Sequence, residues 1–248
     1  MSQEIISEIK NNTGIITLKT EDGLNAINRR MLAEIAESIT AMDMNDAVKA
    51  IIIRGSEKAF STGIDVNEFV ADINQDILEE MYENFEKIAD VKKPVIAAVS
   101  GYALGIGFEM VLACDIVFAS ESACFGHPDL SLGTVPGFGA TQRLPNTIGK
   151  SKTMEMILTG RAMNVREAER AGIVSRIIPL RYLFDESFNT SKRIAALPDL
   201  AVNTSKELIK NAVSNTNLEE GLEIEKQVYK SSIASDEFRQ NLANLAKK

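Results

Sequence analysis

The spacing of hydrophobic positions changes several times along the chain, and each spacing predicts a different element. Two short segments rich in Ile and Thr, Glu4–Lys10 and Gly14–Lys19, flank the turn-forming pair Asn11 and Asn12 and predict a β-hairpin. Apolar residues at helical spacing follow over Asn28–Met42. The chain is therefore expected to open with a hairpin and an amphipathic helix.

Strand-like and helix-like segments alternate through the middle of the chain. The continuous apolar runs Val48–Arg54, Val95–Val99 and Ile116–Ala119 have the length of a strand and predict strands buried on both faces. Between them, Gln75–Ala89 and Ile106–Cys114 have the spacing or the apolar character of helices. This repeated alternation predicts an α/β core.

The C-terminal part of the chain is mainly helical in pattern. Helices are predicted over Ser151–Leu158, Val165–Ala171 and Leu180–Leu197, with a short strand near Ile173–Ile178. From Pro198 on, the sequence is charged, helical and almost free of turn-forming residues. Such a tail either folds back on its own core or packs against a neighbouring subunit, and the composition alone leaves both possibilities open.

Composition narrows the class of protein. The chain has 248 residues, 45% of them hydrophobic, which suits one large domain or a compact domain with a smaller helical appendage. A net charge of −8 argues against a nucleic-acid surface. No stretch approaches the roughly 18–20 apolar residues of a membrane helix, and the N-terminus has no basic start followed by an apolar run. We therefore expect no membrane or nucleic-acid partner.

The two cysteines indicate whether the protein works in a reducing or an oxidising compartment. Cys114 and Cys124 are the two cysteines, both lie in apolar segments, and they form no CxxC pair. This pattern predicts buried thiols rather than a disulfide or a metal site, as in a reducing compartment. A cytoplasmic location is the resulting expectation.

A glycine-rich segment joins the predicted strand Val95–Val99 to the next helix. Gly105 and Gly107 allow the backbone to turn sharply and to approach a ligand, and free N–H groups at a helix start stabilise negative charge. A dinucleotide fingerprint would need a third glycine where Met110 stands, so that interpretation is weak. Glu109 lies in the first turn of this helix; it either complements the helix dipole or is a buried acid kept for proton transfer.

Two further segments are candidates for chemistry. Asp129 follows Pro128 and is either an ordinary turn aspartate or a second acid. His127 is the only histidine, so neither a nucleophilic triad nor a metal cluster can be built on it, and a positioning role near the site competes with a packing role. The loop around Gly63 follows a predicted strand and offers a second backbone donor for an oxyanion.

These segments together resemble the enoyl-CoA hydratase/isomerase (crotonase) family. The resemblance rests on Lys93–Pro179, which begins KPVIAAVSGYALGIGFE, and on Gly55–Phe69, GSEKAFSTGIDVNEF, and it covers nearly the whole chain. It implies an α/β, ClpP-like spiral of ββα units with a C-terminal helical region that builds trimers, often paired into hexamers. Residues 1–195 would form the spiral core with the acyl-CoA site, and residues 196–248 the oligomerisation region.

The same resemblance implies the site residues. Glu109 and Asp129 fall on the two acidic positions of the family's hydratases, and the backbone N–H groups of Ile64 and Ile106 on the two oxyanion donors. Lys58, or a lysine of a neighbouring subunit, would meet the CoA phosphates. The implied substrate-binding and CoA-binding residues are Asn25, Ala26, Lys58, Thr62, Ile64, Asp65, Val66, Asn67 and Ile106.

At three positions the sequence departs from the family pattern. Glycine is usual in place of Ile106 and alanine is frequent in place of Ile64, so a short or narrow acyl group is expected. Asp129 stands where glutamate is usual, and its reach is shorter by about 1.5 Å, which affects proton-transfer geometry. The choice between a hydratase and its relatives therefore depends on Asp129.

The function implied is reversible syn hydration of a 2-trans-enoyl-CoA to a 3-hydroxyacyl-CoA, with CoA entering as part of the substrate and no metal or redox cofactor. An enoyl-CoA isomerase is the nearest alternative, although one isomerase type carries its acid where this chain has Gly137. A dehydratase acting on a 3-hydroxyacyl thioester, and a non-catalytic binding or scaffold protein, are the others. The partners expected are an acyl-CoA and further copies of the chain, in a homotrimer or homohexamer.

Overall fold

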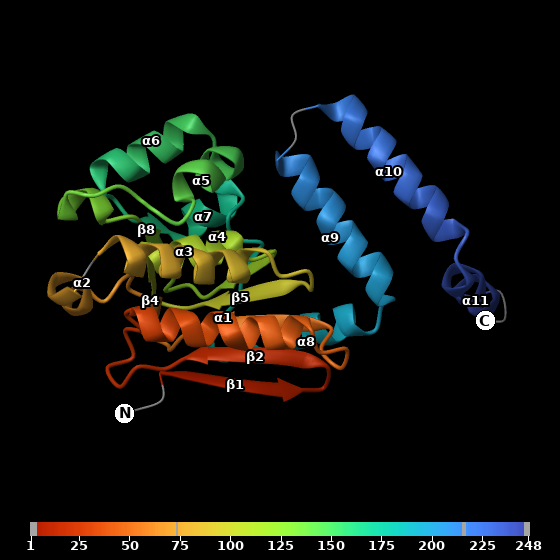
Figure 1. The fold of residues 1–248 in the computed structure, drawn as a ribbon, viewed down its shortest axis with the longest axis horizontal. Helices are drawn as coiled ribbons and strands as arrows, with labels where there is room; N and C mark the ends of the chain where they lie inside the picture. Colours follow the sequence, from red (N-terminus) through yellow and green to blue (C-terminus); the bar gives the residue numbers. More distant parts are fainter. Residues whose placement is uncertain (1–3, 73, 215–216, 246–248) are drawn as a thin grey trace. The chain divides into compact units, whose positions relative to one another are not determined.

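The computed structural model describes residues 4–72, 74–214 and 217–245 (Figure 1). The chain divides into two compact units, Met1–Ala196 and Leu197–Lys248. Within the described residues, no helix is both long enough and apolar enough to cross a membrane. The roles predicted for the two parts, acyl-CoA binding and oligomerisation, stay predictions.

The first unit is built on a six-stranded sheet in the order β1-β2-β3-β5-β7-β10. β1 and β2 form the predicted antiparallel hairpin, closed by Asn11 and Asn12 at φ 47° and 62°, which suits a two-residue hairpin turn. The remaining neighbours pair in parallel. The strands are β1 Ile5–Lys10, β2 Thr13–Leu18, β3 Ala50–Arg54, β5 Val95–Val99, β7 Ile116–Ala119 and β10 Arg176–Ile177.

A second sheet has four short strands in the order β4-β6-β8-β9, the last pair antiparallel. β4, β6 and β8 each follow directly on a strand of the large sheet, so successive strand pairs add one position to both sheets. This arrangement is the predicted spiral of ββα units. The strands are β4 Ala59–Ser61, β6 Tyr102–Leu104, β8 Cys124–Gly126 and β9 Met163–Asn164.

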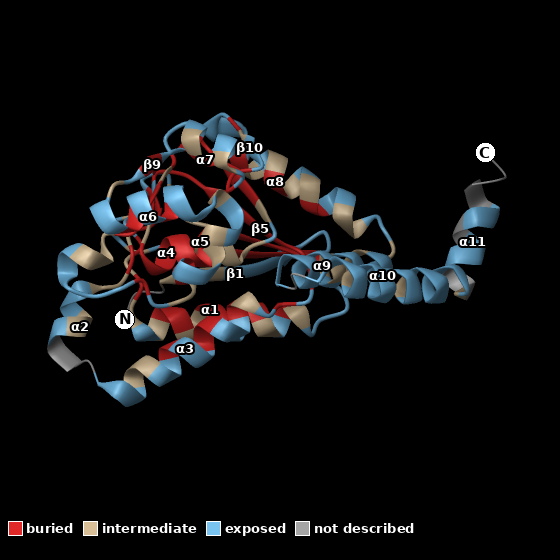
Figure 2. Ribbon diagram, turned by 90° about the horizontal axis from the view of Figure 1, so that it is seen from above, coloured by how far each residue is buried: buried red, intermediate tan, exposed pale blue. Residues whose placement is uncertain are grey.

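Helices cover both faces of the large sheet. Alternate residues of β3 point to opposite faces, so Ile51 and Ile53 join the main core while Ile52 joins a smaller cluster with Leu183 of α8. Figure 2 shows the buried faces of α1 and α4 in red. The helices are α1 Arg29–Asp43, α2 Val66–Asp72, α3 Gln75–Ala89, α4 Ile106–Ala113, α5 Ala140–Ile148, α6 Lys150–Thr159, α7 Val165–Ala171 and α8 Leu180–Ala195.

The predicted elements of the first unit are largely confirmed. α1 begins after Asn28, whose side chain accepts the Met31 N–H at 2.7 Å, and α3 has the predicted bounds. The second sheet was not predicted from periodicity, because its strands have only two or three residues. The predicted burial of the cysteines was too strong: Cys114 and Cys124 are only half-buried, since each lies at the end of an element.

The second unit consists of α9 Asp199–Ser214, α10 Leu218–Ile233 and α11 Asp236–Leu245. No residue of α9 or α10, all of which are described, is buried. Large apolar side chains stay exposed on these two helices, among them Ile209, Leu222 and Tyr229. The unit therefore has no buried core of its own in these two helices.

Candidate active site

The first part of the site is the turn from β6 into α4. Gly105 has φ 51° and ψ −129°, a backbone conformation that side chains disfavour, and its N–H donates to Gly126 O at 2.9 Å. This turn delivers the chain into α4 at Ile106. Because Ile106 is the first residue of the helix, its N–H has no acceptor within the helix. The turn therefore offers a backbone donor at the start of a helix.

A second loop, which follows β4, lies against this turn. Gly63 has φ 105°, and a Cβ at this position would lie 3.8 Å from Gly105 Cα. Gly63 O accepts the Ile27 N–H at 2.7 Å and the Asp65 N–H donates to Ile27 O at 2.9 Å, which fixes the loop on both sides of Ile64. Within the described residues, the Ile64 N–H makes no backbone hydrogen bond. The two predicted oxyanion donors thus come from adjoining loops.

Glu109 lies in α4 and is buried, with a relative exposure of 1%. Its Oε1 accepts two backbone hydrogen bonds, from the Phe138 N–H at 2.9 Å and the Ala140 N–H at 3.0 Å. Ala140 is the first residue of α5, so the carboxyl group stands at the N-terminus of that helix. Glu109 is therefore held by main-chain groups about one turn from the Gly105 turn.

The surroundings of Glu109 shift its acidity. Burial raises the pKa of the carboxyl group, whereas the Ala140 N–H, the charge that His127 carries when it is protonated, and the Phe138 N–H lower it. The charge of Asp129, when it is ionised, adds to the upward shift. The net direction of the pKa is upward. A raised pKa makes a carboxylate a stronger base, which suits proton transfer near neutral pH.

Asp129 approaches the same turn from β8. It opens a short 3₁₀ helix, Asp129–Leu132, and its side chain is 19% exposed. Oδ2 lies 3.2 Å from His127 Nδ1. Oδ1 lies on the side of the glycine turn, because a Cβ on Gly105 would come within 3.9 Å of it. The structure thus brings Asp129 and the Gly105 turn together.

Sequence reasoning missed an aromatic cluster beside Glu109. The Phe138 ring lies 4.8 Å from that of Tyr82 and 5.2 Å from that of Phe85, both on α3. A Cβ on Gly137 would come within 3.1 Å of Tyr82 Oη. The only signal in the sequence is the glycine-rich run PGFGA, which predicts a tight loop but not its partner. These rings therefore lie next to the Phe138 N–H, which donates to Glu109 Oε1.

The residues predicted to bind CoA lie in two neighbouring segments. Ile27 and Ile64 form a β-bridge, and the Thr62 N–H donates to Leu24 O at 3.0 Å, so residues 24–27 run beside residues 62–65. Asn25 is buried and its side chain donates to Ala59 O at 2.9 Å, so this side chain holds the fold together. The predicted CoA-binding residues that these two segments and the start of α2 carry are Asn25, Ala26, Thr62, Ile64, Asp65, Val66 and Asn67.

Apart from Ile106 at the start of α4, the remaining predicted contact with the substrate is Lys58. It is exposed, and its Nζ donates to Asp22 O at 3.1 Å, which joins the loop before β4 to the turn before residue 24. A phosphate that binds Lys58 would compete with this one carbonyl. The role of Lys58 and of the other residues in CoA binding stays a prediction.

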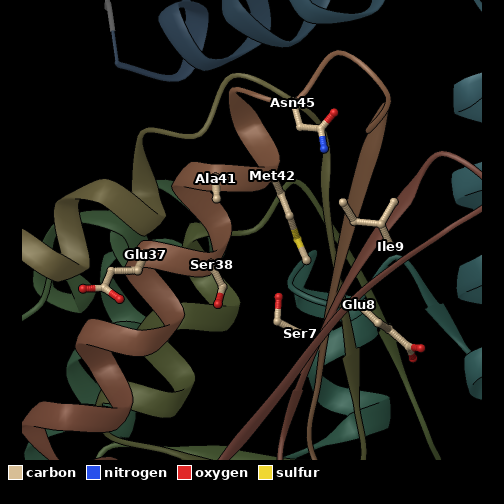
Figure 3. A pocket seen from close by; sticks show the side chains of 8 residues that line it. All are labelled: Ser7, Glu8, Ile9, Glu37, Ser38, Ala41, Met42 and Asn45. Carbon is tan, nitrogen blue, oxygen red and sulfur yellow. The ribbon is translucent and has the colours of Figure 1, made fainter.

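A separate groove of about 560 Å³ lies between β1 and α1 (Figure 3). Ser7 and Ile9 line it from the strand, and Ser38 and Met42 from the helix. None of the predicted site residues lines this groove. Among the described residues, no group of three or more His, Cys, Asp and Glu side chains could hold a metal ion.

Comparison with known proteins identifies the family. The model of the enoyl-CoA hydratase/isomerase family matches residues 8–248. The chain belongs to this family. The family assignment made from the sequence motifs is thus confirmed, and the match extends through the C-terminal helices.

Individual family members agree over nearly the full length. A probable enoyl-CoA hydratase of Rhizobium meliloti is 39% identical over 98% of this chain and 95% of its own. The mitochondrial enoyl-CoA hydratase of Pongo abelii is 36% identical over 96% and 83%. The solved structure of enoyl-CoA hydratase from Bacillus anthracis has a TM-score of 0.92 at 32% identity, covering 99% and 96%. The crotonase fold is therefore confirmed.

Proposed function

We propose that the protein hydrates a 2-trans-enoyl-CoA to the 3-hydroxyacyl-CoA. The observation that carries this proposal is that two acidic residues meet one glycine turn in a chain of the enoyl-CoA hydratase/isomerase family. The Glu109 N–H donates to Gly105 O at 3.0 Å, and Asp129 Oδ1 lies on the side of Gly105. Hydration needs one group to take a proton from water and another to give a proton to carbon. A pair of carboxyl groups with different surroundings can divide these tasks.

The thioester oxygen is proposed to bind the N–H groups of Ile64 and Ile106. Addition of water at C3 pushes negative charge onto this oxygen, and preorganised donors stabilise that charge, with about 3 kcal/mol for one donor. The adjoining positions of the two loops support this role. The N-terminus of α4 adds its dipole in the same direction.

Glu109 is proposed as the base. Its Oε1 is occupied by two N–H groups that favour the carboxylate, and the raised pKa increases its proton affinity. Glu109 takes one proton from water while the water oxygen bonds to C3, and the C2=C3 electron pair moves toward the thioester. Asp129 then gives its proton to C2. A proton passing from Glu109 to Asp129 through solvent restores both groups, so the net change is the addition of one water.

The CoA part of the substrate is proposed to lie along residues 24–27 and 62–67. These segments run side by side and end at the oxyanion loop, so a thioester held at Ile64 would place its CoA there. The mechanism uses CoA as part of the substrate and needs no separate cofactor. Ile64 is only partly buried and is larger than the alanine that is frequent at its position, which supports a short or narrow acyl group, whereas the Ile106 side chain is buried in the main core.

We also propose that the protein forms a homotrimer, or a homohexamer of paired trimers. The exposed apolar side chains of α9 and α10, among them Ile209, Leu222 and Tyr229, would be covered by neighbouring copies. Light scattering of the purified protein tests this directly. A monomeric mass would contradict the proposal.

The hydratase proposal is tested by the loss of absorbance of crotonyl-CoA and longer 2-enoyl-CoAs. We expect wild type to hydrate at least the short substrates, and Glu109→Gln and Asp129→Asn to lower kcat by about 10³-fold, since acid–base groups contribute about 10²- to 10⁴-fold. CoA affinity should change little. Glu121→Gln, at an exposed position, is the matched control and should retain full activity.

The outcome also separates the alternatives. If wild type hydrates no chain length but shifts the double bond of 3-enoyl-CoAs, the protein is an isomerase and the proposal is wrong. Equal rates from C4 to C16 would contradict the narrow acyl site while leaving the hydratase assignment intact.

A further inference from the structure

His127 is buried beside the site and takes no part in the proposed proton transfers. Its relative exposure is 0%, and its ring packs 5.1 Å from that of Phe108, the residue before Glu109. It follows β8 and precedes the 3₁₀ helix that carries Asp129. An apolar side chain would fill this position without the cost of burying two ring nitrogens. The polar ring therefore calls for an explanation beyond packing.

The two ring nitrogens have different surroundings. Nδ1 lies 3.2 Å from Asp129 Oδ2, whereas Nε2 is buried and has no hydrogen-bond partner within the described residues. A proton on Nε2 would leave a buried N–H unpaired, at a considerable cost. A neutral ring with its proton on Nδ1 instead leaves only a lone pair unmatched. The hydrogen-bond arrangement thus favours the Nδ1–H form, which donates to Asp129.

We propose that His127 is a positioning residue for Asp129, which holds Oδ2 through Nδ1–H so that Oδ1 faces the glycine turn. This inference rests on the proposed function for its catalytic consequence. Oδ1 is the oxygen near Gly105, so it is the one placed to give a proton to C2. As Asp129 loses that proton, negative charge spreads to Oδ2, where the Nδ1–H is already in place to stabilise it.

The short side chain of Asp129 makes this support important. The carboxyl group is partly exposed and, besides His127, no side-chain donor to it is found within the described residues. Without the imidazole, rotation about the Cβ–Cγ bond would exchange the two oxygens. Asp129 would then lose both its fixed orientation and the stabilisation of its charged form.

The first experiment reads the imidazole directly. Because His127 is the only histidine, the ¹⁵N NMR spectrum of the untagged protein contains one pair of imidazole signals. We expect the neutral ring to carry its proton on Nδ1, with signals that move in Asp129→Asn and stay in place in Asp46→Asn, an exposed control. An Nε2-protonated ring, or no response to Asp129→Asn, would overturn the proposal whether or not the protein is a hydratase.

The second experiment uses variants that keep or lose the Nδ1 donor. Asn carries its amide nitrogen near the place of Nδ1, whereas Gln places it near Nε2 and Leu has none. We expect kcat for crotonyl-CoA to fall about 10- to 100-fold in His127→Gln and His127→Leu, the range of a hydrogen bond to a charged group. His127→Asn should stay within about threefold of wild type, and KM should change little in all three.

A double-variant cycle separates positioning from general damage. If His127 acts through Asp129, adding His127→Gln to Asp129→Asn should lower kcat no further. Losses that multiply, or His127→Asn as inactive as His127→Leu, would show a merely structural role and overturn the proposal. Failure of wild type to hydrate any enoyl-CoA would instead refute the proposed function, while the NMR result would still decide the His127–Asp129 contact.

Discussion

Glu109 and Asp129 lie at the same turn but are held in different ways. Glu109 is buried in a regular helix and accepts two backbone N–H groups from the start of another element. Asp129 is partly exposed, lies in a 3₁₀ helix, and is held by the side chain of His127. One carboxyl group is therefore positioned by the fold, and the other by a single neighbouring residue.

This difference determines how a mutation of nearby residues should affect the position of each carboxyl group. Backbone donors are present whatever side chains the loop carries, so the position of Glu109 depends on the path of residues 138–140. The position of Asp129 depends on the identity of His127 and on its own length. The position of the Asp129 carboxyl group should therefore change more readily on mutation than that of Glu109.

Shortening Glu109 to aspartate should lower kcat more than lengthening Asp129 to glutamate. Glu109→Asp withdraws the carboxyl group by about 1.5 Å and leaves the N–H groups of Phe138 and Ala140 unpaired, so we expect kcat to fall about 10³-fold and stability to fall by about 1–3 kcal/mol. Asp129→Glu keeps an acid at a partly open position and should lower kcat only about tenfold. Steady-state kinetics and denaturant unfolding measure both. Equal losses would show that the two carboxyl groups are constrained to the same degree.

The sequence predicts the long elements of this fold better than the short ones, because a periodic pattern needs many residues. The hairpin, α1 and α3 follow from turn residues and from spacing over many residues. The strands of the second sheet have two or three residues, too few for periodicity to register. Tertiary contacts decide how these short strands pair. In the sequence, only the family resemblance implied that the strands exist.

The same limit applies to the site. Glu109 and Asp129 were predicted from their motifs, and both lie at the Gly105 turn. The partners of Glu109 are backbone N–H groups about thirty residues farther along, and such groups have no side-chain signature. The contact of His127 with Asp129 has a visible spacing of two residues, but spacing alone does not show which ring nitrogen faces the carboxyl group.

The glycine turn that both acids share should be more sensitive than an equivalent glycine elsewhere. Gly105→Ala forces a side chain onto φ 51°, so we expect the turn to shift, the Ile106 N–H to tilt, and kcat/KM to fall about 100-fold. Gly160→Ala is the matched control, because Gly160 has φ 67° and ends α6. Apart from its chain neighbours, no atom of the described residues lies within 4 Å of a Cβ placed on it. Both variants should lose about 1 kcal/mol of stability. Full activity in Gly105→Ala would argue against the oxyanion role of this turn.

The smallest expected effect is a pH dependence of stability that belongs to Glu109. Its pKa is raised in the folded protein, chiefly by burial, above the ordinary value of 4.5. The folded state then holds the proton more tightly than the unfolded state, so the stabilisation from protonation is full below the unfolded pKa and is lost as pH rises through the folded pKa. Glu109→Gln has no such titration. The difference in Tm between Glu109→Gln and wild type should therefore grow in favour of the variant as pH rises from about 4, and then level off.

Thermal unfolding of the two proteins across this range measures the effect, and a change of about 1 kcal/mol corresponds to about 2–4 °C for a chain of this size. Glu121→Gln, which removes an exposed carboxyl group, should follow wild type at every pH. If the difference instead grew in favour of wild type as pH rises, the two N–H groups and the α5 N-terminus would outweigh burial, and Glu109 would be a weaker base than ordinary glutamate. Since the proposed mechanism asks Glu109 to take a proton from water, the sign of this small difference tests the base assignment without any substrate present.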